Sequence, residues 1–177
     1  MKIVIKTAVC VLGLVALASA QEVASAVHGT VKKVDAATKT AVIATAKGTE
    51  ETVQFTDKTV VHGAVAGSKD TFQGLKEGSE VVIHTTGTGA KKTAVEVDNL
   101  SKDGLKSTEG TITKVDAGTK KIVVKAADGT EQTFDMTAHA AAEAGKATAA
   151  GTEKAGKATV YYTEEGGKKV VHFFKKM

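Results

Sequence analysis

The five histidines of this chain are its best candidates for metal chemistry: His28, His62, His84, His139 and His172. Imidazole nitrogen is the commonest protein ligand for transition metals. No two of these histidines are spaced as H-x-H or H-x-x-x-H, so no local motif defines a site. His62, His84 and His139 are our candidate ligands for zinc or copper. The competing interpretation is that they are strand histidines, exposed or half-buried, with no ligand.

Residues for catalysis are harder to find. Most carboxylates that stand out lie in predicted turns, namely Asp35, Asp116, Asp128, Glu164 and Glu165. No serine stands in a G-x-S-x-G elbow. An envelope hydrolase would need such groups to converge on a polar pocket. We therefore predict no catalytic residue, no cofactor and no enzyme activity.

A phosphate-binding loop is suggested by GTEKAGK at 151–157, which satisfies G-x-x-x-x-G-K. Ala158 follows where the motif needs Ser or Thr for magnesium, and the segment precedes a predicted strand instead of opening a helix. We predict no nucleotide binding. All 24 basic residues are lysine, and arginine is the side chain best suited to gripping phosphate and guanine. The sequence therefore argues against nucleic acid as a partner.

The first twenty residues have the pattern of a secretory signal peptide. Lys2 and Lys6 precede an apolar run at 7–17, and Ala18-Ser19-Ala20 supplies the small residues of a cleavage site before Gln21. A membrane anchor is the alternative, but the run is shorter than the ~20 residues that cross a bilayer. We expect a periplasmic or secreted protein without stable membrane insertion. Cleavage removes Cys10, the single cysteine, so the exported chain offers no thiolate ligand.

The rest of the chain is a sequence written twice. GTVKKVDAATKTAVIATAKGTEETVQF at 29–55 aligns with GTITKVDAGTKKIVVKAADGTEQTFDM at 110–136, at a constant offset of 81. We predict a signal peptide at 1–20, a first repeat at 21–98, a linker at 99–107 and a second repeat at 108–177. Internal duplication at such a period fixes the domain organisation before any element is assigned.

Each repeat alternates apolar and polar residues with period two, as half-buried strands do. The first repeat predicts strands near 27–35, 39–47, 51–56, 79–86 and 92–98. The second predicts strands near 108–116, 120–126, 130–136, 157–163 and 168–174. After the third strand we expect a helical turn at 68–75 in the first repeat, and in the second a helix at 138–155 that Gly145 and Gly151 break or fray. The fold class is all-β: two tandem five-stranded Greek-key barrels of the OB type, each with a short helical insert.

The G-T-V-x-x-V-D opening at 29–35 and the segment LKEGSEV at 75–81 resemble a known family. They are similar to the secreted bacterial small barrels of unknown function that often occur in tandem. The resemblance covers both repeats and implies the barrel fold and an envelope location. It implies no catalytic residues.

These observations favour an exported, non-enzymatic binding or structural module whose partner is an unidentified envelope protein or glycan. The alternative is a periplasmic metal-binding protein that uses its histidines. Adjacent residues of a strand face opposite sides, so Tyr162 and Phe173 are candidates for an exposed partner surface. The other interpretation is that such aromatics pack where the two barrels meet.

Overall fold

The computed structural model describes residues 25–64, 74–87, 89, 92–149 and 156–177. Within these residues the protein is mainly β, with eleven strands and one helix. The first six strands are β1 (Ser25–Asp35), β2 (Thr40–Thr45), β3 (Glu50–Gln54), β4 (Val60–His62), β5 (Glu80–Thr86) and β6 (Lys92–Asn99). The remainder are β7 (Lys106–Asp116), β8 (Lys121–Lys125), β9 (Glu131–Met136), α1 (Ala138–Ala149), β10 (Lys157–Glu165) and β11 (Lys168–Lys176). All ten strands predicted from sequence are found, with ends within two residues of those expected.

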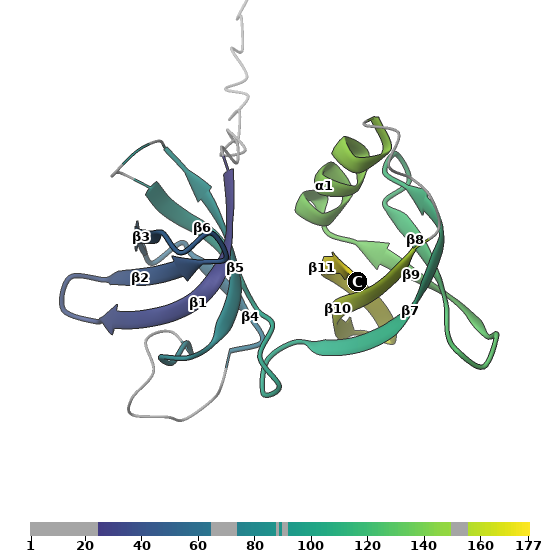
Figure 1. The fold of residues 1–177 in the computed structure, drawn as a ribbon, viewed down its shortest axis with the longest axis horizontal. Coiled ribbons are helices and arrows are strands. Elements are labelled where there is room, and N and C mark those ends of the chain that lie inside the picture. Colours follow the sequence, from purple (N-terminus) through teal and green to yellow (C-terminus); the bar gives the residue numbers. More distant parts are fainter. Residues whose placement is uncertain (1–24, 65–73, 88, 90–91, 150–155) are drawn as a thin grey trace, which may run out of the picture.

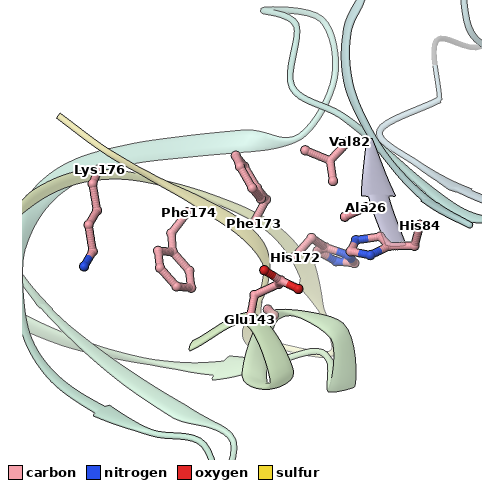
Figure 2. A pocket seen from close by; sticks show the side chains of 9 residues that line it. Ala26, Val82, His84, Glu143, His172, Phe173, Phe174 and Lys176 are labelled. Atoms are coloured by element: carbon pink, nitrogen blue, oxygen red, sulfur yellow. The ribbon is translucent and has the colours of Figure 1, made fainter. Parts of the chain in front are cut away.

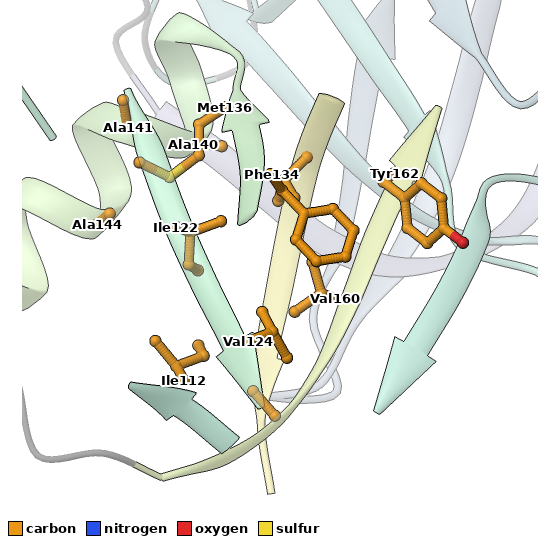
Figure 3. Close-up of a cluster of buried hydrophobic side chains, with 12 residues drawn as sticks. Ile112, Ile122, Val124, Phe134, Met136, Ala140, Ala141, Ala144, Val160 and Tyr162 are labelled. Atoms are coloured by element: carbon orange, nitrogen blue, oxygen red, sulfur yellow. The ribbon is translucent and has the colours of Figure 1, made fainter. Parts of the chain in front are cut away.

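Strands β7 to β11 close into a barrel of order β10-β11-β9-β8-β7, which we call the C-terminal barrel. Its pairs are antiparallel except for β9 with β11, which run parallel. The core is built on Ile122, Phe134 and Val160, each at most 1% exposed (Figure 3). Alternation along each strand directs these side chains inward, as the period-two pattern predicted.

Helix α1 follows the third strand of this barrel, as expected. The Thr137 hydroxyl accepts the Ala140 backbone N–H and caps the first turn. The predicted break at Gly145 is wrong, because the helix continues through it to Ala149. Ala140, Ala141 and Ala144 are buried in the barrel core, and this packing offsets the about 1 kcal/mol that a helical glycine costs. Gly151 lies outside the described residues.

The first six strands form the N-terminal sheet, of order β3-β2-β1-β5-β6-β4, with a further pairing of β3 with β6. Its core holds Ile43, Val53, Phe55, Ile83 and Val97. Strand β4 was not predicted, because three residues are too few to show a period. The helical turn expected at 68–75 falls mostly outside the described residues, although Leu75, at its end, is fully buried.

Local features of the two units recur 81 residues apart. Register shifts lie between Val31 and Lys33 and between Ile112 and Lys114. The turns after β1 and β7 hold Lys39 and Lys120 at positive φ, 51° and 53°. Asp35 and Asp116 accept backbone N–H groups within these turns, which is the structural role that an Asp side chain takes in a turn.

The units also repeat a requirement for glycine on the first strand. A Cβ on Gly29 would lie 2.2 Å from the carbonyl oxygen of Ala44, and one on Gly110 would lie 2.6 Å from that of Lys125. Because backbone is the obstacle in both places, neither position tolerates a side chain without movement of the neighbouring strand.

The two units lie side by side and meet through a small apolar cluster of their own (Figure 1). Val82, Leu100 and Leu105 are buried there, with Tyr161 and Phe173 packed against them. The expectation of an exposed Tyr162 is wrong, because Tyr162 points into the C-terminal barrel and is 9% exposed. A register shift between Tyr161 and Tyr162 accompanies this arrangement. The aromatics on this face therefore pack where the two units meet.

The signal-peptide prediction for 1–20 and most of the phosphate-loop-like segment lie outside the described residues. Among the helices that are described, none has the length and apolar character needed to span a bilayer.

Candidate metal centre

Strand register gathers four polar side chains on the outer face of the N-terminal sheet. His84 pairs with Glu96 across β5 and β6, and His62 pairs with Asp98 across β4 and β6. Their neighbours Ile83 and Val97 point into the core. Since successive strand residues face opposite sides, His84, His62, Glu96 and Asp98 project away from that core.

The C-terminal barrel contributes two histidines to the same place. His139 stands in the first turn of α1, and His172 lies on β11. Tyr161 pairs with Phe173 and Tyr162 with Val171, which leaves His172 as the extra residue of a β-bulge. Bulges redirect a side chain that regular pairing would place elsewhere. After a deletion of four residues in the second repeat, the sequence alignment sets Val95 of β6 opposite His172. Val95 is likewise skipped in the pairing of β5 with β6.

Together these side chains form the histidine–carboxylate cluster, made of His62, His84, Glu96, Asp98, His139 and His172. One ligand atom from each of His62, Glu96, Asp98 and His172 can be chosen so that all four lie within 4.8 Å of one another. The side chain of Asp98 is fully buried, and those of His172 and His84 are 3% and 4% exposed. The site is therefore enclosed by the two units.

The histidines and carboxylates of the cluster lie at ion-pair distances from one another. His172 Nδ1 lies 3.2 Å from Asp98 Oδ1 and 3.6 Å from Glu96 Oε1. Five buried nitrogen and oxygen atoms of the cluster have no hydrogen-bond partner among the described residues: His84 Nε2, both Asp98 oxygens, His139 Nδ1 and His172 Nδ1. Each of these five atoms lies at ion-pair distance from another group of the cluster, so the buried nitrogens and carboxylate oxygens face one another.

The ionisation of each carboxylate in the cluster depends on the neighbouring histidines. Burial opposes ionisation of Glu96, but contacts with His172 and His62 and the nearby His139 and His84 outweigh it, so the pKa of this carboxyl lies far below its ordinary value. Burial likewise opposes ionisation of Asp98, and contacts with His172 and His84 lower its pKa nonetheless.

The same coupling acts on His172. Burial alone lowers the pKa of a histidine, yet contacts with Asp98 and Glu96 raise the pKa of His172 to about 9. Its other ring nitrogen, Nε2, lies 3.0 Å from the Thr163 hydroxyl. That contact fixes the ring with Nδ1 toward the carboxylates, as a hydrogen bond to the other ring nitrogen does in metal-binding histidines.

A cavity of about 290 Å³ reaches the cluster from outside. His84 and His172 lie at one end of it, next to Ala26 and Val82, and Phe174 lies toward the other (Figure 2). The cavity connects the site with its surroundings and is large enough to hold several water molecules.

The three histidines proposed from sequence, His62, His84 and His139, all lie in this cluster. Sequence reasoning missed His172, Glu96 and Asp98. A usable signal for the carboxylates was present: on neighbouring predicted strands 79–86 and 92–98, His84, Glu96 and Asp98 share the polar face. His28 lies outside the cluster, where it pairs with Glu80 at 2.9 Å. The prediction that Glu164 and Glu165 lie in a turn is wrong, because they are the last two residues of β10; Glu96 and Asp98 lie on β6.

Comparisons with known proteins identify no family for this chain. No family model matches the chain, and no curated protein matches it. Among solved structures, the silver-bound form of CusF matches with a TM-score of 0.32 and 17% identity, covering 42% of this chain and 95% of that one. This weak similarity concerns a small β-barrel fold. Membership in the secreted tandem-barrel family stays a prediction.

Proposed function

We propose that this protein is an exported, non-enzymatic metal-binding protein that holds a divalent transition-metal ion, zinc or copper(II), between two barrels of the OB type. The observation that carries the proposal is the enclosed set of His62, Glu96, Asp98 and His172, with ligand atoms within 4.8 Å of one another. The features repeated 81 residues apart support a duplicated barrel. The N-terminal sequence pattern supports export, and no catalytic role is assigned to the site.

The spacing of the ligand atoms fits such an ion. A tetrahedral zinc ion with ligands about 2.1 Å away holds them about 3.4 Å from each other. Glu96 Oε1 lies 3.4 Å from His62 Nε2, and His172 Nδ1 lies 3.2 Å and 3.6 Å from Asp98 and Glu96 oxygens. These three separations are close to those of a filled site, and all four ligand atoms lie within 4.8 Å of one another.

The donor types point to the class of metal. Imidazole nitrogen and carboxylate oxygen suit zinc and copper(II), whereas copper(I) prefers thiolate and thioether sulfur. The two carboxylates match the charge of one divalent ion when the histidines are neutral. An ion would also give a partner to the buried nitrogen and oxygen atoms that lack one.

Zinc and copper(II) titrations of protein purified without a histidine tag test the proposal, by calorimetry and by metal analysis after dialysis. We expect saturable binding tighter than about micromolar, and Asp98→Asn to weaken it by at least about 100-fold, since even outer-shell changes cost 10–100-fold. Glu80→Gln is the matched control, because Glu80 pairs with His28 outside the cluster. Thermal melting in chelator checks that both variants fold. Equal affinities for the Asp98→Asn variant and the unmodified protein would overturn the assignment.

A further inference from the structure

The two carboxylates of the cluster each face in two directions. Glu96 Oε1 lies 3.4 Å from His62 Nε2 and 3.6 Å from His172 Nδ1, whereas Glu96 Oε2 contacts His139 Nδ1. One oxygen of this carboxylate is thus directed at one pair of histidines, and the second oxygen at a histidine outside that pair.

Asp98 divides its oxygens in the same way. Its Oδ1 lies 3.2 Å from His172 Nδ1, and its Oδ2 lies 3.4 Å from His84 Nε2. The rings of the histidines pack in matching pairs. His62 and His172 have centroids 4.1 Å apart, and His84 and His139 have centroids 4.5 Å apart.

The cluster therefore has two halves of equal composition. Each half contains one histidine from the N-terminal sheet, one from the C-terminal barrel, one oxygen of Glu96 and one oxygen of Asp98. The first half has His62 and His172, and the second has His84 and His139. Two nitrogens and two carboxylate oxygens make a complete set of protein ligands for a transition-metal ion.

A single ion in the first half would leave the second half without an ion. There, His84 Nε2 lies 3.4 Å from Asp98 Oδ2, His139 Nδ1 contacts Glu96 Oε2, and the His84 side chain is 4% exposed. Two buried histidine nitrogens thus face the two outward carboxylate oxygens, and a second cation would bind all four atoms.

We propose that the cluster holds two divalent cations bridged by Glu96 and Asp98. This inference rests on the proposed function, which needs one ion alone. Carboxylate-bridged pairs of this kind hold their ions about 3.5–4 Å apart. The charge of two ions exceeds that of two carboxylates, so hydroxide or a small anion completes the shell. The cavity that His84 and His172 line gives it access.

The number of ions bound per chain and the magnetic coupling between them test whether the site holds a pair of ions. Native mass spectrometry of tag-free protein with zinc should give two ions per chain, and the double variant His84→Gln/His139→Gln should bind one. His28→Gln, a histidine outside the cluster, should still bind two. With copper(II), the first equivalent should give an isolated electron paramagnetic resonance signal, and the second should broaden or quench that signal because the ions are close.

The outcomes separate this inference from the proposed function. Two coupled copper ions support both. One ion per chain, or two copper ions with uncoupled signals, overturns the paired site and leaves the proposed function standing. No bound ion overturns both. The copper experiment uses the unmodified protein, so it does not depend on whether the double variant folds.

Discussion

Replacing His172 with glutamine should remove a distinct pH dependence of stability from the metal-free protein. Contacts with Asp98 and Glu96 raise the pKa of His172 from 6.5 to about 9. A raised pKa means that the folded state favours the protonated ring, so the stabilisation is complete below pH 6.5 and disappears as the pH rises through 9. At 1.36 kcal/mol per pH unit, the shift corresponds to about 3 kcal/mol.

Urea unfolding in chelator at pH 6, 7, 8 and 9.5 measures this pH-dependent stabilisation. The unmodified protein should lose about 3 kcal/mol more than His172→Gln over this range, or about 6–12 °C in melting temperature for a chain of this size. The variant is expected to be less stable at low pH, and the difference in slope is the informative quantity. His28→Gln is the control and should keep the slope of the unmodified protein. Parallel pH profiles for His172→Gln and the unmodified protein would refute the reasoning about the buried pairs.

Two further predictions concern the proton at the site and the glycine of the first strand. Because the ring of His172 is protonated up to about pH 9, zinc must displace that proton when it binds. The affinity for zinc should therefore rise about tenfold per pH unit between pH 6.5 and 8.5. Calorimetry in two buffers at pH 7 should detect at least one proton released per ion, and no release would contradict the prediction. Gly29→Ala should cost about 3 kcal/mol by urea unfolding, because its Cβ meets the carbonyl of Ala44 at 2.2 Å. Gly48→Ala should lower the free energy of unfolding by about 1 kcal/mol, because φ is +78° there but no atom obstructs a Cβ. Equal losses for the two variants would show that Gly29 does not lie close to the Ala44 carbonyl.

The strands and turns could be predicted from the sequence because they depend on residues that are close together in it. Alternation along Lys121–Lys125 predicts β8, and the turns at Asp35 and Asp116 predict where the first strands end. These signals depend on residues adjacent in sequence and on the two faces of a strand. Gly145 shows the limit. Its low helix propensity predicted a break, and the burial of Ala140, Ala141 and Ala144 against the barrel overrode it.

The candidate site was readable in part. His62, His84 and His139 stood out by residue type, because imidazole is a metal ligand wherever it lies. Glu96 and Asp98 resembled ordinary outward residues of a half-buried strand, and His172 aligned with Val95 of the first repeat. Neither pattern reveals that the outward face of β6 is covered by another unit.

By itself, the sequence predicted a duplication, ten of the eleven described strands, the turn residues and three of the histidines. The tertiary structure decided that β4 joins the edge of the sheet beside β6, that a bulge turns His172 toward Asp98, and that the two units enclose these groups between them. The physical reason is that strand periodicity arises between neighbours in sequence, whereas the cluster brings together residues up to 110 positions apart, from His62 to His172. Such contacts are set by how the two units pack, and no local pattern encodes them.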